Sequence, residues 1–124
     1  MATDVVPVRL GARSYEVRIG PGLIDRAGEE LAPMLRRKRV AIVTEERVAA
    51  RHLPRLSAAL DRAGIAHAAL TLPAGEGTKG WDGLRVATEF LLDEKVERRD
   101  LVIAFGGGVI GDLAGFASAI LRRG

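Results

Sequence analysis

A glycine-rich turn between two apolar segments is the part of the sequence best suited to chemistry. Residues 101–112 read LVIAFGGGVIGD, in which an apolar run ends at three consecutive glycines and an alanine-rich apolar segment follows. This order is typical of a buried strand, a tight turn and the start of a helix. Glycine leaves the backbone bare, and the unpaired N–H groups of a helix N-terminus favour an anion. The segment therefore predicts a nucleotide or sugar-phosphate site at the end of this strand.

The spacing of these glycines allows two interpretations. Gly106, Gly108 and Gly111 match the dinucleotide fingerprint G-x-G-x-x-G between a predicted strand and a predicted helix. The match follows the last strand rather than the first, and the acidic residue expected about 20 positions later has no place before Gly124. A glycine turn without a ligand would look similar. Asp112 is expected in the first helical turn, where it either interacts with the helix dipole or accepts hydrogen bonds from a ligand.

Other polar residues give weaker indications. Glu76 and Lys79 lie in a predicted loop over residues 73–79, where they are either solvated or hold a ribose and a phosphate. His52 and His67 share no ligand spacing with each other or with a carboxylate, so no metal site is expected. No nucleophile–base pair with a recognisable arrangement is present. No catalytic residue is therefore predicted within the chain.

The pattern of apolar residues predicts the elements that position the glycine turn. Alternation over the first 20 residues predicts a β-hairpin. Helical spacing follows over residues 23–35, 47–63, 81–95 and 109–121, and short apolar strands over 39–44, 65–72 and 100–105. This order predicts an α/β fold with a parallel sheet and helices on both faces. Three loops, residues 44–47, 73–79 and 106–108, then meet at the carboxyl edge of the sheet, where ligands bind in such folds.

Composition restricts the class of protein. The length of 124 residues suits one domain, and the 48% apolar but only 4% aromatic content implies a core of Val, Ile, Leu and Ala. The net charge is +3, yet no aromatic residues interleave with the basic ones, so nucleic-acid binding is not expected. The absence of cysteine excludes disulfides and thiolate metal sites. No apolar run of about 20 residues and no signal peptide is found, so a cytoplasmic protein without a membrane span is expected.

Three segments together resemble the N-terminal region of the 3-dehydroquinate synthase family. They are VTEERV at 43–48, PAGEGTKGWDGL at 73–84 and GGGVIGDLAGFASAILRRG at 106–124, and their spacing and the opening hairpin agree as well. The resemblance implies that residues 1–124 form a Rossmann-like NAD-binding domain and that a C-terminal domain, with a zinc or cobalt site, lies outside the chain. The implied reaction of the whole enzyme converts 3-deoxy-D-arabino-heptulosonate 7-phosphate to 3-dehydroquinate and phosphate.

The resemblance also implies roles for individual residues. Glu45 belongs to the adenosine side, Glu76 holds a ribose with Lys79 nearby, and Asp112 reaches the nicotinamide side. Arg123 reaches the phosphate of the sugar-phosphate substrate, in the neighbouring subunit of a homodimer. The residues implied to bind NAD are Glu45, Gly75, Glu76, Gly77, Thr78, Lys79, Gly107, Gly108, Val109, Ile110, Gly111 and Asp112.

Departures from the family pattern leave alternatives open. The usual D-G-E is Ala74-Gly75-Glu76, Glu45 stands in place of Asp, and Arg47 and Gly80 replace a common Asn and Ser. The chain lacks the family's metal ligands, so alone it is expected to be inactive. The family's sheet and domain interface continue beyond these residues, so an apolar surface near the last helix is expected to be exposed. The alternatives are a fragment of a sister sugar-phosphate cyclase or of a metal-dependent polyol dehydrogenase, a non-catalytic nucleotide-binding module, and a fragment whose glycine turn is empty.

Overall fold

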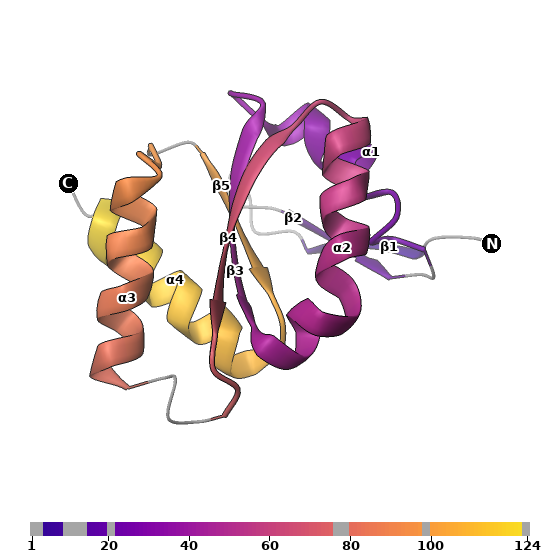
Figure 1. Ribbon diagram of the computed structural model, residues 1–124. Helices are drawn as coiled ribbons and strands as arrows, with labels where there is room; N and C mark the ends of the chain where they lie inside the picture. Colours follow the sequence, from indigo (N-terminus) through magenta and orange to yellow (C-terminus); the bar gives the residue numbers. More distant parts are fainter. Residues whose placement is uncertain (1–3, 9–14, 20–21, 76–79, 98–99, 123–124) are drawn as a thin grey trace.

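The protein folds as an alternating α/β domain preceded by a hairpin (Figure 1). The computed structural model describes residues 4–8, 15–19, 22–75, 80–97 and 100–122. The elements are β1 (Asp4–Val8), β2 (Tyr15–Ile19), α1 (Ala27–Leu31), the 3-10 helix η2 (Ala32–Met34), β3 (Arg39–Glu45), α2 (Glu46–Arg62), β4 (Ala66–Leu72), α3 (Trp81–Asp93), β5 (Leu101–Phe105) and α4 (Gly108–Arg122). The predicted fold class and the predicted order of strands and helices are confirmed.

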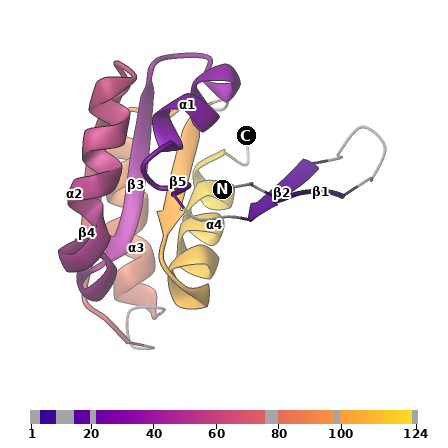
Figure 2. The ribbon, with the colours of Figure 1, turned by 90° about the vertical axis from the view of Figure 1, so that its right-hand side faces the viewer.

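A three-stranded parallel sheet forms the centre of the domain. Its strand order is β4–β3–β5, so β3 lies between the other two. Val40 to Thr44 of β3 are all buried, as expected for a central strand covered on both faces. Strands β1 and β2 pair antiparallel in a separate sheet, with Val6 opposite Val17. Figure 2 shows this hairpin standing to one side of the domain.

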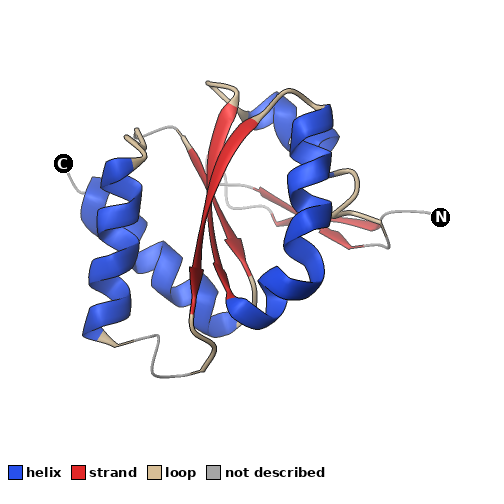
Figure 3. Cartoon of the chain, viewed as in Figure 1, coloured by secondary structure: helices blue, strands red, loops and turns tan. Residues whose placement is uncertain are grey.

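Helices cover both faces of the sheet, as the alternation predicts (Figure 3). On one face, α3 and α4 pack against alternate residues of β3, with a core of Ala41, Val43, Leu72, Leu84, Ala87, Leu91, Ile110, Leu113, Ala114 and Ala117. On the other face, α1 and α2 pack with a core of Val40, Ile42, Leu56, Leu60 and Ile65. Side chains of a strand alternate between its faces, so the continuous apolar run of β3 supplies both cores.

The predicted helix over residues 23–35 is wrong in its extent. Only Ala27–Leu31 is α-helical, and the chain then tightens into the 3-10 turn Ala32–Met34. Pro33 explains this ending, because it has no N–H to donate to the carbonyl four residues earlier, which the next α-helical hydrogen bond would require. The apolar spacing still indicates which side chains are buried. Side chains before, within and after the short helix pack against the core on this face of the sheet, namely Ile24, Ala27, Leu31 and Leu35.

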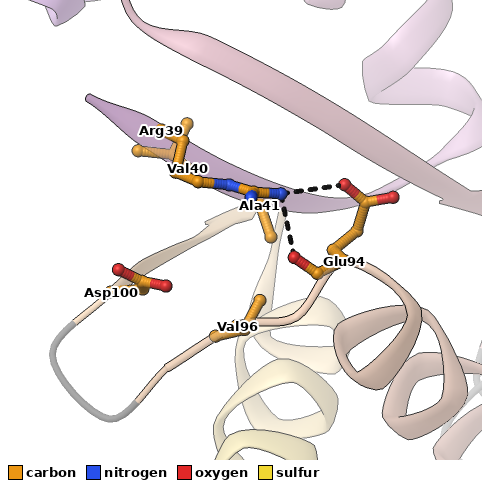
Figure 4. A pocket seen from close by; sticks show the side chains of 6 residues that line it. All are labelled: Arg39, Val40, Ala41, Glu94, Val96 and Asp100. Carbon is orange, nitrogen blue, oxygen red and sulfur yellow. Dashed lines mark hydrogen bonds and ion pairs between the residues drawn. The ribbon is translucent and has the colours of Figure 1, made fainter. Parts of the chain in front are cut away.

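Ion pairs fasten the amino edge of the sheet. Arg37, just before β3, donates from Nε to Oδ1 of Asp100 at 3.1 Å and makes a second contact with Oδ2. Arg39 donates from Nη2 to the backbone carbonyl of Glu94 at 2.8 Å and lies 3.5 Å from its carboxylate (Figure 4). These contacts hold the connection between α3 and β5 against the start of β3. The loops of the predicted site lie at the opposite, carboxyl edge of the sheet.

Candidate functional site

The three parallel strands end at one edge, where a hollow of about 240 Å³ lies. Residues after β3, after β4 and after β5 line it together: Glu45, Arg47, Pro73, Ala74, Gly75, Gly107, Gly108, Val109 and Ile110. We call this the loop hollow. The predicted meeting of three loops is thus confirmed by residues that are far apart in the sequence. Six of the residues implied to bind a nucleotide line it, namely Glu45, Gly75, Gly107, Gly108, Val109 and Ile110.

The consecutive glycines after β5 differ in what requires them. A Cβ on Gly106 would lie 3.2 Å from the side chain of Ile110, so packing accounts for this glycine. A Cβ on Gly107 or Gly108 would meet no atom within 4 Å, and neither residue has a positive φ. Gly75, in contrast, has a φ of +111°, a conformation that favours glycine. Packing and backbone conformation therefore leave Gly107 and Gly108 unexplained, and their bare backbone borders the loop hollow.

Two helices begin at the loop hollow. Helix α2 starts at Glu46, and α4 starts at Gly108. Glu45 caps α2, because its Oε1 accepts a hydrogen bond from the Val48 N–H at 2.7 Å. The first N–H groups of a helix have no intrahelical acceptor and carry a partial positive charge. The exposed cation Arg47 lines the same hollow, so Arg47 and the start of α4 favour an anionic group, whereas the Glu45 carboxylate, engaged in the α2 cap, opposes one.

Asp112 lies in a neighbouring hollow rather than in the loop hollow. This second hollow, of about 390 Å³, is called the α3–α4 hollow and is lined by Gly80, Trp81, Leu84, Asp112, Leu113 and Phe116. The prediction that Asp112 occupies the first helical turn is wrong: α4 begins at Gly108, and its first turn contains no acidic residue. The GGG run allows the helix to start before Val109, which moves Asp112 into the second turn. Gly111 is exposed and is a lining residue of neither hollow.

Two hydrogen bonds that the sequence did not reveal hold the segments around the loop hollow together. The Ala74 N–H donates to Oε1 of Glu46 at 3.2 Å, which links the loop after β4 to the start of α2. The Thr44 hydroxyl, fully buried, donates to the Phe105 carbonyl at 2.6 Å. A polar residue at the end of the apolar run RVAIVT was the available signal for Thr44. Glu76, Gly77, Thr78, Lys79 and Arg123 lie outside the described residues.

Among the residues that the structure describes, neither histidine belongs to a group of three or more potential metal ligands. His67 Nδ1 lies 3.2 Å from the Ile65 carbonyl and 3.8 Å from an Asp61 carboxylate oxygen. Within the described ranges, no three His, Cys, Asp or Glu side chains come together in a way that could hold a metal ion. No helix in those ranges is long and apolar enough to cross a membrane.

Comparison with known sequences identifies relatives over the whole chain. A protein-family model described as "3-dehydroquinate synthase N-terminal" matches residues 69–124. The 3-dehydroquinate synthase of Cereibacter sphaeroides is 67% identical over 100% of this chain, which covers 34% of that protein. The enzyme of Ruegeria pomeroyi is 63% identical over 96% of the chain and 32% of its own length. The chain thus spans about one third of the curated relatives that it matches.

Solved structures share the fold. The crystal structure of 2-deoxy-scyllo-inosose synthase complexed with carbaglucose-6-phosphate, NAD+ and Co2+ matches with a TM-score of 0.79 and 19% identity, over 99% of this chain and 32% of that one. The 2-epi-5-epi-valiolone synthase of Streptomyces hygroscopicus, with NAD+ and Zn2+ bound, matches with a TM-score of 0.77 and 27% identity, over 94% of this chain and 32% of that one. Taken together, the sequence matches show that the chain is similar to the N-terminal region of 3-dehydroquinate synthases, and the solved structures show that it shares the fold of these cyclases.

Proposed function

We propose that the loop hollow binds NAD and that the chain supplies part of the cofactor site of a 3-dehydroquinate synthase. The observation that carries the proposal is the bare backbone of Gly107 and Gly108, which borders the hollow although neither packing nor φ requires glycine there. A pyrophosphate could approach this backbone closely and receive hydrogen bonds from the N-terminus of α4. Two solved structures with this fold, those of 2-deoxy-scyllo-inosose synthase and 2-epi-5-epi-valiolone synthase, have NAD+ bound.

The proposed roles follow the two hollows. Gly107 to Ile110 hold the pyrophosphate, and Glu45 lies on the adenosine side. Asp112 faces the nicotinamide side from the α3–α4 hollow, with Gly111 beside it. The loop that begins at Gly75 contributes the remaining contacts to a ribose, through Glu76, Gly77, Thr78 and Lys79. When bound, NAD would supply an acceptor for the hydride that leaves the carbon bearing a substrate hydroxyl, as that hydroxyl loses its proton and becomes a carbonyl.

The activity of the whole enzyme is also part of the proposal. It converts the sugar phosphate 3-deoxy-D-arabino-heptulosonate 7-phosphate to 3-dehydroquinate and phosphate, with a zinc or cobalt ion that polarises reacting oxygens. We further propose that the enzyme is a cytoplasmic homodimer in which Arg123 reaches the substrate phosphate of the neighbouring subunit. Since the chain covers 34% of its relative from Cereibacter sphaeroides, we expect these 124 residues alone to release no phosphate from the substrate.

Calorimetric titration with NAD tests the cofactor site, with two matched glycine variants. Gly108→Val places a side chain at the loop hollow, whereas Gly115→Val places the same side chain elsewhere on the same helix; at both positions an added Cβ meets nothing within 4 Å. Both variants should fold, because both positions are open. We expect Gly108→Val to weaken NAD binding at least about tenfold by occupying the hollow, and Gly115→Val to leave it unchanged.

Two results would contradict the proposal. Unchanged affinity of Gly108→Val would show that the nucleotide does not lie against this turn. Absence of binding to the unmodified chain would favour the alternative of an empty glycine turn.

A further inference from the structure

We propose that Thr44 positions the glycine turn, residues 106–108, for the cofactor; this inference rests on the proposed NAD site. Thr44 is the next-to-last residue of β3 and pairs in register with Phe105, the last residue of β5. Its side chain is fully buried, and within the described ranges it is the one buried residue that is polar or charged. It adjoins the proposed site without lining it.

The Thr44 hydroxyl controls the start of the turn through one hydrogen bond. Its Oγ1 donates to the Phe105 carbonyl at 2.6 Å, whereas the Glu45 carbonyl lies at the limiting distance of 3.5 Å. The Phe105 carbonyl and the Gly106 N–H belong to one planar peptide unit. Fixing that carbonyl therefore fixes the direction in which Gly106 leaves the strand.

A second contact holds the turn from the side of α4. Gly106 packs so closely on Ile110 that a Cβ there would lie only 3.2 Å away. The turn is thus held by the hydrogen bond from Thr44 and by packing on Ile110, while Gly107 and Gly108 border the loop hollow. Because Glu45 follows Thr44 directly, one buried hydroxyl connects two of the segments that line the hollow.

An apolar side chain of the same shape would fill the position but lose this connection. Valine at residue 44 would pack as well as its neighbours Ile42 and Val43, which are 0% exposed. It would leave the Phe105 carbonyl without the hydroxyl donor, so the hydrogen bond that fixes the direction of this peptide unit would be lost. The turn would then lose its fixed direction even though the sheet remained intact. The hydroxyl of Thr44 is therefore expected to affect cofactor affinity more than core packing.

Calorimetric NAD titration of the full chain and three variants tests this role. Thr44→Val removes the hydroxyl, and Thr44→Ser keeps it. Thr88→Val is the matched control, because the Thr88 hydroxyl donates to the Leu84 carbonyl at 2.8 Å within α3 and Thr88 lines neither hollow. We expect Thr44→Val to weaken NAD binding about tenfold, Thr44→Ser to remain within about threefold of the unmodified chain, and Thr88→Val to have no effect.

A second readout does not require NAD. Amide NMR resonances of Gly106 and Gly107 should move in Thr44→Val and remain in place in Thr88→Val. If Thr44→Val does not fold, the same titration compares Thr44→Ala with Thr44→Ser.

Each outcome decides the matter. Equal affinity with and without the hydroxyl, in a chain that binds NAD, overturns the role of Thr44 and leaves the proposed function standing. Failure of the unmodified chain to bind NAD rejects the proposed function, and the role of Thr44 with it.

Discussion

At the residue scale, Asp100 is the centre of the contacts at the amino edge of the sheet. Its side chain is only 5% exposed, and its carboxylate accepts hydrogen bonds from Arg37 and from the Glu97 N–H at 2.8 Å. The Arg37 guanidinium, followed by the Glu97 backbone bond and the charges of Arg37 and Arg39, holds the pKa of Asp100 below its usual value against the opposing effect of burial. The ionised form is therefore the one that stabilises the fold.

This lowered pKa predicts how stability depends on pH. The stabilisation is complete above the unfolded-state pKa of about 3.9 and is lost as the pH falls through the lower folded-state value. Asp100→Asn should reduce the free energy of unfolding by about 1 kcal/mol at pH 7, a modest value because Arg37 is partly exposed. Urea unfolding should show this difference shrinking as the pH drops below about 4.

The exposed Asp93 of α3 offers a control. Asp93→Asn should change the free energy of unfolding little at pH 7 and at pH 3. A difference for Asp100→Asn that stays constant between pH 7 and pH 3 would argue against the ion pair as its cause.

At the element scale, a close contact between α1 and α2 depends on Gly28. A Cβ there would lie 2.5 Å from the Ala59 carbonyl oxygen and 2.6 Å from the Ala63 Cβ. We expect Gly28→Ala to lower the free energy of unfolding by about 1–3 kcal/mol through overpacking. Gly115→Ala, in open space on α4, should instead raise it by about 0.5–1 kcal/mol through helix propensity. Chemical denaturation of both variants measures the contrast, and equal effects would contradict the close packing of α1 on α2.

The elements also show why the fold could be predicted from the sequence. Strand β3 reads as an apolar run and is buried on both faces, and α2 ends at Arg62, one residue before the predicted end at residue 63. Apolar runs and apolar helical spacing of this kind indicate directly which side chains are buried in the fold. Burial does not require a helix, however: the apolar residues around Pro33 pack on the sheet from turns and a 3-10 helix.

The position of the candidate site could be predicted from the sequence, but the detailed arrangement of its residues could not. The glycine turn is visible in the sequence itself. The meeting of the three loops follows from the parallel direction of the strands, which the alternation of strands and helices along the sequence predicts. The separation of Asp112 from Gly107 does not, because it depends on where α4 starts and how α3 packs beside it. Thr44 was missed because its hydrogen bond joins residues that are distant in sequence.

At the scale of the whole molecule, the two edges of the sheet have different properties. Ion pairs close the amino edge, whereas two helix starts, a cation and bare glycines border a hollow at the carboxyl edge. Large apolar side chains are exposed beside this hollow, with Trp81 at 79% and Phe116 at 60%. Of the large apolar side chains described in α4, Phe116 is the one exposed, where an apolar surface near the last helix was expected. A hollow bordered by charged side chains and helix starts, next to a more strongly apolar one, suits a ligand that has a phosphate part and a flat ring.

The most direct test of the NAD site is an NMR titration of the isotope-labelled chain with NAD. The proposed site predicts that the amide resonances of Gly107, Gly108 and Val109 shift progressively and saturate, while those of Arg39 and Asp100 at the opposite edge stay in place. Resonances that do not move at the glycine turn, or that move chiefly at the amino edge, would contradict the proposal that the carboxyl edge of this sheet holds the nucleotide.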